Sequence, residues 1–470
     1  MKFRRWSAVL VALALLAPAG CLDSHALTPD TAAVSDSLRE RTGAGLCTDS
    51  GPDRVFVPNT VSIADGLTAD AAVQLALCNN AAFQDLLLDL GLARADVVQA
   101  GLLPNPEVLY SFPVGPRAFS YAVDLPVDVI LLRPVRVRGA AAEEERARER
   151  LVQAGLDLAR DVRLAHADWA LARDRLRVAE ESLKLRDRIA RLTTDRFNAG
   201  DATPLEVSTA RADSLRGKQE ATRAANDLPI FEEKLRNLMG IGAWRVELVP
   251  QSVDPPDEPA EDLEALVAEA VTARPDVRAA ERFIAAADAR VQIARLGWIR
   301  FFGIADATSG PSDHNLAPQF RVTVPIFSGN QGAISRAGVE HERAVRQLRT
   351  VRDRAILEVR QAYAQHAQAA ADYQKWTEEI RPAVEEAVRR AQATYEKGGA
   401  SLVLVLETSR QLIDTRAREA QLRADLTRAW AELERAVGRR MQTTDGDFAA
   451  GRDADNPESP SPKRGGKNGK

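Results

Sequence analysis

Residues 139–200 read GAAAEEERARERLVQAGLDLARDVRLAHADWALARDRLRVAEESLKLRDRIARLTTDRFNAG and contain no proline. Apolar side chains recur along this stretch at alternating steps of four and three residues, the a/d spacing of a coiled coil. These side chains are Leu158, Val162, Ala165, Trp169, Ala172, Leu176, Ala179 and Leu183. A continuous helix over this stretch would be about 90 Å long at 1.5 Å per residue. The sequence therefore predicts one long helix that packs against other helices along its length.

The predicted helix ends at Gly200, because glycine readily adopts the left-handed conformation that closes a helix. Pro204 follows shortly afterwards and suits the first turn of a helix that runs back, to about Met239. The same turn occurs a second time: residues 395–401 repeat residues 197–203 in their pattern of aromatic, glycine and hydroxyl residues. Residues 322–325 likewise repeat residues 123–126. We interpret the chain as a duplication of a unit of about two hundred residues.

The first twenty residues have the composition of a secretory signal. Lys2, Arg4 and Arg5 precede an apolar run over residues 8–17, and this run is too short for a membrane span. Residues 18–21, Pro-Ala-Gly-Cys, resemble the lipoprotein processing box, in which Cys21 would be lipidated after cleavage. Residues 17–19, Ala-Pro-Ala, would alternatively suit ordinary signal peptidase. Asp23 is separated from Cys21 by Leu22, so the retention aspartate directly after the cysteine is absent.

The chain has three cysteines, an odd number for an exported protein. If Cys21 carries lipid, Cys47 and Cys78 remain to form one disulfide in an oxidising compartment. Two unpaired buried thiols are the alternative, and spacing alone does not distinguish the two. We favour the disulfide.

Strand-like alternation of apolar and other residues interrupts the helical pattern twice, before each long helical hairpin. These observations divide the chain into a signal (1–20), an irregular N-terminal extension (21–66), repeat 1 (67–242), a Pro-rich linker (243–262), repeat 2 (263–438) and a disordered tail (439–470). Each repeat is predicted to contain a helix, over residues 67–101 and 263–296, followed by a β-hairpin and a long helical hairpin, and Pro382 is expected to kink the second long hairpin. The β-hairpins are expected at about residues 107–128 and 298–327.

Composition excludes several classes of function. Lys plus Arg number 63 against 67 Asp plus Glu, so no global positive charge attracts nucleic acid. The five histidines are scattered without metal-ligand spacing, and no phosphate-binding loop or nucleophile motif is present. We therefore predict that the chain is not an enzyme, and we expect no cofactor and no metal site.

Four strands cannot enclose water, and open strand edges are not tolerated in lipid. Membrane strands from one such chain must therefore pair with strands of other copies. Two copies would give eight strands and a packed interior, whereas three would give twelve and room for a channel. A small soluble sheet that caps a helical rod is the alternative interpretation of the same pattern.

Over residues 67–438 the chain resembles the TolC-like outer-membrane efflux proteins, in the lipoprotein branch that serves tripartite pumps. The resemblance rests on the duplication, the helix stop at residues 102–106, the strand ends at Pro126 and Pro325, and the two aromatic-x-x-Gly turns. It implies a mainly α fold with a small β part. In that fold, duplicated coiled-coil hairpins and two β-hairpins trimerise into a 12-stranded outer-membrane barrel and a periplasmic helical barrel.

The resemblance also implies partners. The turns at Gly200 and Gly398 would be the periplasmic tips, and they would contact a membrane-fusion adaptor that links the channel to an inner-membrane transporter. The system would be a tripartite efflux or type I secretion system, with the bacterial outer membrane as the location. Drugs, metal ions and secreted peptides all remain candidate cargo.

Candidate gate residues follow from the same resemblance. Tyr395 and Glu206 match a pair that would form a hydrogen bond between the hairpins. Ala400 stands where a cationic partner is usual, and Leu404 replaces an acid and would form a hydrophobic constriction. Glu407 would recur three times around the axis of a trimer as an acidic ring. A solvated helix face is the alternative for Glu206 and Glu407.

Two other classes of protein are considered. A periplasmic adaptor lipoprotein would have one helical hairpin flanked by β-rich domains, whereas this chain has two hairpins and no large β-rich region. A structural periplasmic coiled coil would have no strands between its helices.

Overall fold

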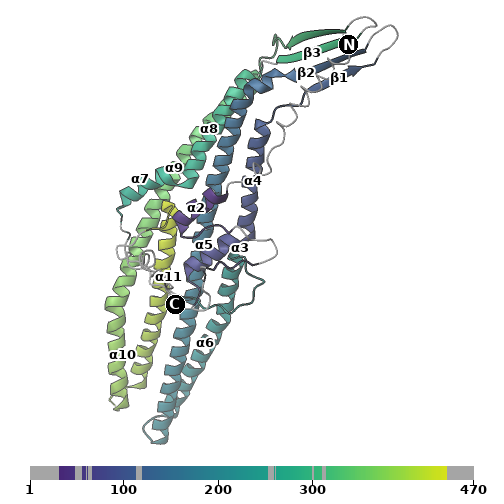
Figure 1. The fold of residues 1–470 in the computed structure, drawn as a ribbon. Helices are drawn as coiled ribbons and strands as arrows, with labels where there is room; N and C mark the ends of the chain where they lie inside the picture. The colour runs from purple at the N-terminus through teal and green to yellow at the C-terminus, as the bar shows by residue number, and fades with distance from the viewer. Residues whose placement is uncertain are drawn as a thin grey trace, which may run out of the picture.

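The computed structural model describes residues 31–47, 55–59, 61, 66–112, 119–251, 259, 261–298, 301–309, 314–397 and 399–441. The molecule is elongated, with a small sheet at one end and the turns of long helices at the other (Figure 1). Shorter helices surround its middle. The elements in chain order are α2 (Thr31–Thr42), α3 (Ala69–Asn79), α4 (Ala81–Gly101), β1 (Glu107–Ser111), β2 (Phe119–Pro126), α5 (Val127–Asn198), α6 (Pro204–Leu238), α7 (Leu263–Ala273), α8 (Pro275–Leu296), β3 (Phe301–Ser309), β4 (His314–Val322), α9 (Gln331–Lys375), the π-helical turn η3 (Trp376–Ile380), α10 (Arg381–Glu396) and α11 (Leu402–Val437).

Helix α5 is the longest element, with 72 residues. It begins directly after β2, earlier than the predicted start at Gly139, and contains Pro134 near its N-terminal end. Pro134 is the eighth residue of α5 and lies beyond the first turn, so it removes the hydrogen bond to the carbonyl four residues earlier while the helix continues past it. With α6 it forms the first helical hairpin, which we define as α5 and α6.

The second helical hairpin, α9 to α11, has an interruption that the first lacks. The chain passes through the π-helical turn η3 directly before Pro382, where the sequence predicts a kink. A π-helical turn contains one extra residue and shifts the face of the helix that follows. Trp376 at this turn donates from Nε1 to the carbonyl of Thr415 in α11, at 3.0 Å. The irregular turn is thereby held against the returning helix.

Two predicted continuous helices are each divided in the structure. The helix expected over residues 67–101 breaks at Asn80, which accepts a hydrogen bond from the Phe83 N–H and so begins α4 as its N-cap. The helix expected over residues 263–296 breaks at Arg274, after which Pro275 begins α8. An asparagine N-cap is an ordinary signal for the start of a helix, and so is a proline at the first helical position. The prediction of unbroken helices overlooked both signals.

The N-terminal extension is also more ordered than the sequence predicts, because residues 31–42 form helix α2. Its Val34 and Leu38 are completely buried. Leu38 packs closely on α5 at Gly155, where a Cβ atom would lie only 2.5 Å from the leucine Cδ2. Tertiary packing therefore stabilises a helix whose polar composition suggested irregular chain.

The β-hairpins lie within the predicted regions and join into one antiparallel sheet with the order β1-β2-β3-β4. Strands β2 and β3, from different repeats, pair from Phe119 with Ser309 to Pro126 with Phe302. The two repeats thus share one sheet as well as adjacent helices. Strands β1 and β4 form its two edges (Figure 1).

The largest apolar core lies at the middle of the rod, where α3, α5 and the end of α6 meet around Trp169. The predicted seam is buried there, at Val162, Ala165, Trp169 and Ala172. Farther along α5 the buried positions become Val178, Ser182, Arg186 and Ile189. The seam rotates because α5 leaves the central core and packs between α6 and α11.

Candidate functional site at the helical tips

The end of the first helical hairpin is a tight turn that local sequence determines. Gly200 adopts a φ of +89°, and the Asp201 N–H donates to the carbonyl of Arg196 at 2.8 Å. Thr203 then begins α6 as its N-cap, with Pro204 in the first turn. The conformation at Gly200 is one that L residues with side chains rarely adopt. The residues of the turn therefore specify how the first helical hairpin reverses direction.

Glu206 completes a capping box at the start of α6. Its Oε2 accepts hydrogen bonds from the Thr203 N–H at 2.6 Å and from the Thr203 hydroxyl at 3.0 Å. These hydrogen bonds lower the pKa of the Glu206 carboxyl. Within the described residues of one chain the Glu206 carboxylate bonds Thr203 and not Tyr395, and the pair between the hairpins stays a prediction.

Tyr395 is buried in an apolar cluster between the two hairpins, and 3% of it is exposed. The other members of this cluster, which we call the tip cluster, are Ile189, Ala210, Leu402, Val405 and Leu406. The Arg196 guanidinium lies 4.6 Å from the centre of the tyrosine ring, a cation–π contact. Tyr395 thus joins α10 to α5 by packing rather than by the hydrogen bond expected from sequence.

The second turn contains Gly398, which lies outside the described residues. After it, the Gly399 N–H donates to the carbonyl of Thr394 at 2.9 Å, and the Ser401 hydroxyl accepts from the Leu404 N–H at 3.3 Å as the N-cap of α11. Both hairpins consequently end in a capped, ordered helix start.

The remaining two gate candidates lie outside the tip cluster. Leu404 is 48% exposed, and Glu407 is exposed on the next turn of α11. Among the described residues, Glu407 forms no ion pair. Both side chains are therefore available to another copy of the chain or to solvent. Other large apolar side chains are exposed near the same two turns, namely Phe197, Leu205 and Val403.

Arginines of α11 tie the second hairpin to the first along their shared length. Arg428 contacts Asp168 of α5 at 2.6 Å, and Arg416 contacts Glu181 of α5 at 2.8 Å. Partly exposed pairs of this kind each contribute little to stability. Their effect is instead on alignment, because they fix which residues of α11 lie beside which residues of α5.

Closer to the tip, the buried Asp213 of α6 lies between two arginines, Arg186 of α5 and Arg410 of α11. Sequence reasoning missed this group. A signal was present: Ala210, Asp213 and Gly217 follow at helical spacing on one face of α6, so an acidic side chain occupies a face otherwise lined by small residues. The arginine partner on α11 is distant in sequence and gives no local signal.

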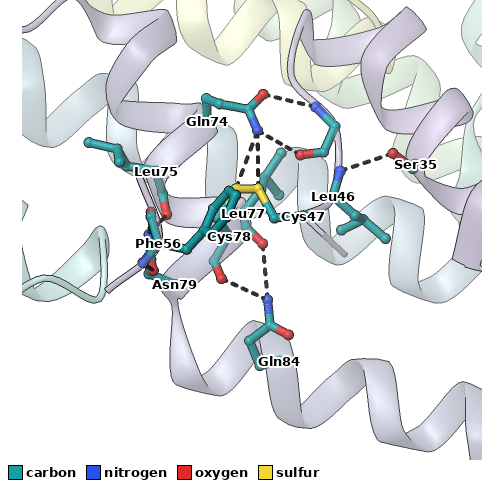
Figure 2. The surroundings of a disulfide bond; sticks show 11 residues. Ser35, Leu46, Cys47, Phe56, Gln74, Leu75, Leu77, Cys78, Asn79 and Gln84 are labelled. Atoms are coloured by element: carbon teal, nitrogen blue, oxygen red, sulfur yellow. Dashed lines mark hydrogen bonds between the residues drawn. A yellow bond between two sulfur atoms is a disulfide. The ribbon is translucent and has the colours of Figure 1, made fainter. Parts of the chain in front are cut away.

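A disulfide joins Cys47 to Cys78 and attaches the N-terminal extension to α3. Figure 2 shows the Gln74 side chain next to this disulfide. Its Oε1 accepts from the Gly45 N–H at 3.1 Å, and its Nε2 donates to the Gly45 carbonyl at 2.9 Å and to the Cys78 Sγ at 3.3 Å. Residues 31–47, which we call the strap, are thus fixed to the middle of the rod. Cys21 lies outside the described residues.

The strap also contacts both repeats. Arg41 donates to the carbonyl of Ala273 at 3.0 Å and to that of Gly438 at 2.8 Å, both in repeat 2. The Thr42 carbonyl accepts from Arg163 of α5 at 3.1 Å. The strap therefore bridges the two repeats at the middle of the rod.

Across the described ranges, no three or more His, Cys, Asp and Glu side chains are grouped so that they could hold a metal ion. None of the described helices is both long enough and apolar enough to cross a membrane.

Comparison with known proteins gives consistent matches over both repeats. The sequence model of the family described as "Outer membrane efflux protein" matches residues 72–241 and 266–439. The chain is 22% identical to the cobalt-zinc-cadmium resistance protein CzcC of Cupriavidus metallidurans over 380 residues, covering 79% of this chain and 90% of that protein. It is 26% identical to the pyoverdine export outer membrane protein OpmQ of Pseudomonas putida over 283 residues, covering 57% and 58% of the two chains.

Solved structures agree in fold. The outer membrane protein VceC of Vibrio cholerae superposes with a TM-score of 0.65 at 18% identity, covering 79% of this chain and 96% of that one.

Proposed function

Because this chain belongs to the outer membrane efflux protein family, we propose that it is the outer-membrane channel of a tripartite efflux or type I secretion system. In this role it carries substrate delivered by an inner-membrane pump across the periplasm and the outer membrane. The long helices span the periplasm and the sheet lies in the outer membrane. The proposal gives the chain no catalytic role and no cofactor.

The observation that supports this proposal most strongly is the sheet with two open edges. Strands β1 and β4 each have one partner strand within the described residues. Large apolar side chains are exposed on the sheet, including Val108 at 68% and Phe320 at 70%, and Phe112, directly after β1, is 75% exposed. Lipid tolerates such side chains but not open edges. Pairing β4 of one copy with β1 of the next satisfies both requirements.

We propose three copies. Three four-stranded sheets would close a barrel of twelve strands, which leaves room for water, whereas two would close one of eight, whose interior side chains fill. The long helical hairpins of the three copies would then continue the channel into the periplasm.

The tips at Gly200 and Gly398 are proposed to contact a membrane-fusion adaptor. Exposed apolar side chains around the two turns support this assignment, with Leu205 at 75% and Val403 at 74% exposure. Exposed apolar side chains that gather at one end of a protein favour contact with another chain. Glu407 is proposed as an acidic ring around the threefold axis and Leu404 as a constriction beside it.

We propose that the inner-membrane pump, and not this chain, selects the substrate. The names of the two relatives refer to metal resistance and to pyoverdine export, so relatives of similar sequence serve unlike cargo. Lipidation of Cys21 after removal of residues 1–20 is proposed to anchor the N-terminal end of the processed chain in the outer membrane.

The experiment that tests the assembly is native mass spectrometry of protein extracted from outer membranes into detergent. We expect particles of three chains, and a mass increase at the N-terminal peptide that matches acylation of Cys21. Cys21→Ser supplies the matched control, since it removes the lipid and leaves the copy number at three. Particles of one or two chains, or recovery of the wild-type chain in the soluble periplasmic fraction, would contradict the proposal.

A further inference from the structure

A cavity of about 460 Å³ lies between α5 of the first hairpin and α10 and α11 of the second, and it is partly open to solvent. Along α10 it lies between η3, which contacts α11 through Trp376, and Tyr395 of the tip cluster. Pockets that hold small organic molecules have volumes of about 300–1,000 Å³. The cavity is therefore large enough for such a molecule.

Two features explain why the helices leave this space. The π-helical turn η3 inserts one extra residue before α10, which rotates the side chains of α10 relative to those of α9. The buried side chains that face the space are also short, namely Val178 and Ser182 of α5 and Val388 of α10. Short side chains that follow a change of helical face do not interdigitate to the density of a core.

The wall of the cavity is mostly apolar. Among the residues that line it, the buried polar one is Ser182, which is 2% exposed. Its hydroxyl has no hydrogen-bond partner among the described residues, although buried hydroxyls nearly always have one. An apolar wall with a free hydroxyl suits a ligand that is mostly apolar and carries one hydrogen-bonding group. The apolar lining residues are Val178, Leu185, Val388, Leu412 and Ile413.

The charged side chains that line the cavity leave one carboxylate with little compensation. Arg416 contacts Glu181 at 2.8 Å and lies 3.6 Å from Glu385, a distance too long for a hydrogen bond. Arg389 instead pairs at 2.7 Å with Glu386, which does not line the cavity. The Glu385 carboxylate can therefore accept hydrogen bonds from a positively charged ligand.

We propose that this cavity binds an amphipathic primary amine. Its protonated ammonium group donates hydrogen bonds to Glu385 and Ser182, and its apolar body fills the space beside Val388. An ammonium group brings three N–H donors and the positive charge that the carboxylate attracts. An anion of the same shape would place a second negative charge beside Glu385. The inference concerns a binding site and does not depend on the channel role.

The test is equilibrium dialysis of the detergent-purified protein against biphenylmethylamine, a primary amine with an apolar body. Biphenylcarboxylate, an anion of nearly the same shape, is measured beside it. Dialysis against micelles without protein corrects for uptake of either probe by the detergent. We expect saturable binding of one amine per chain, and binding of the carboxylate that is about ten times weaker.

Three variants locate the binding. Glu385→Gln should weaken binding of the amine about tenfold, since it removes a hydrogen bond between charged groups. The Glu385 side chain is 39% exposed, so the fold is retained. Val388→Phe fills the cavity without changing its charge and should abolish saturable binding. Glu396→Gln is the matched control: it removes an exposed glutamate of the same helix that does not line the cavity, and it should leave the affinity unchanged.

Wild-type protein that binds no more amine than micelles alone would overturn the proposal. Binding that is the same in Glu385→Gln and Val388→Phe as in wild type would also overturn it, because the amine would then lie elsewhere. Equal affinity for the amine and the carboxylate would overturn the assignment to an amine. A protein that binds the amine in this way but forms no pores would overturn the proposed channel function and leave the binding site standing.

Discussion

Removing the disulfide between Cys47 and Cys78 should release the strap from the middle of the rod. The two cysteines are separated by 31 residues in sequence. In the chain-entropy description, a cross-link that closes a loop of this length stabilises the folded state by about 3.7 kcal/mol. If the disulfide restrains local opening of the strap to the same extent, its loss makes opening several hundred times more frequent. Noncovalent contacts of Leu38 and Arg41 would remain.

Hydrogen exchange read by mass spectrometry measures this opening directly, because amides in α2 exchange when the strap detaches. We expect peptides from residues 31–46 of Cys47→Ser/Cys78→Ser to exchange at least a hundred times faster than in wild type. Ser35→Ala is a graded control, since it removes only the hydrogen bond from the Leu46 N–H, at 3.1 Å, and should accelerate exchange about fivefold. Exchange in α6 should not change in either variant. An acceleration of less than threefold in Cys47→Ser/Cys78→Ser would show that noncovalent packing, and not the disulfide, holds the strap on the rod.

Three further predictions concern the central core and the tip. Gly240→Ala should prevent normal assembly, because Gly240 has a φ of +70° and a Cβ there would overlap the carbonyl of Asn79; the yield of folded particles on size exclusion checks this. Trp169→Ala should destabilise the protein by about 3–5 kcal/mol, measured by denaturant titration, since the indole is 1% exposed and its loss leaves a cavity. His166 is buried, and desolvation lowers the pKa of its imidazole, so the unfolded chain takes up a proton before the folded chain does as the pH falls below about 6.5. Wild type should therefore lose more thermal stability between pH 7.5 and pH 5.5 than His166→Gln does. Equal losses in the two proteins would contradict this prediction.

The long hairpins and the strands are predictable from sequence because their signals are local. Gly200 and Pro204 mark a turn by backbone preference alone, and the apolar period identifies the helix before it. The alternation at residues 119–126 identifies a strand without any knowledge of its partners. Helix α2 is different, because its burial depends on α5, which is far away in sequence. A polar segment whose helix depends on packing against a distant element carries no comparable local signal.

The gate shows why residue roles are harder to predict than elements. Thr203 and Glu206 have the spacing of a capping box, and this local partner was visible in the sequence. Family resemblance pairs Glu206 with Tyr395, whereas within one chain the carboxylate bonds the nearer Thr203. The pairing of Asp213 with Arg410 joins residues on two hairpins, so only the packed structure brings it to notice.

Single-channel conductance of the purified wild-type protein in a planar bilayer tests the central claim most directly, with Glu407→Ala measured beside it. We expect discrete conductance steps from trimeric particles, selectivity for cations, and weaker selectivity in Glu407→Ala because three negative charges are lost from the entrance. Glu396→Ala, a change at an exposed glutamate on α10 to which we assign no role, should leave selectivity unchanged. Protein that gives no conductance steps while remaining folded would contradict the proposed channel function.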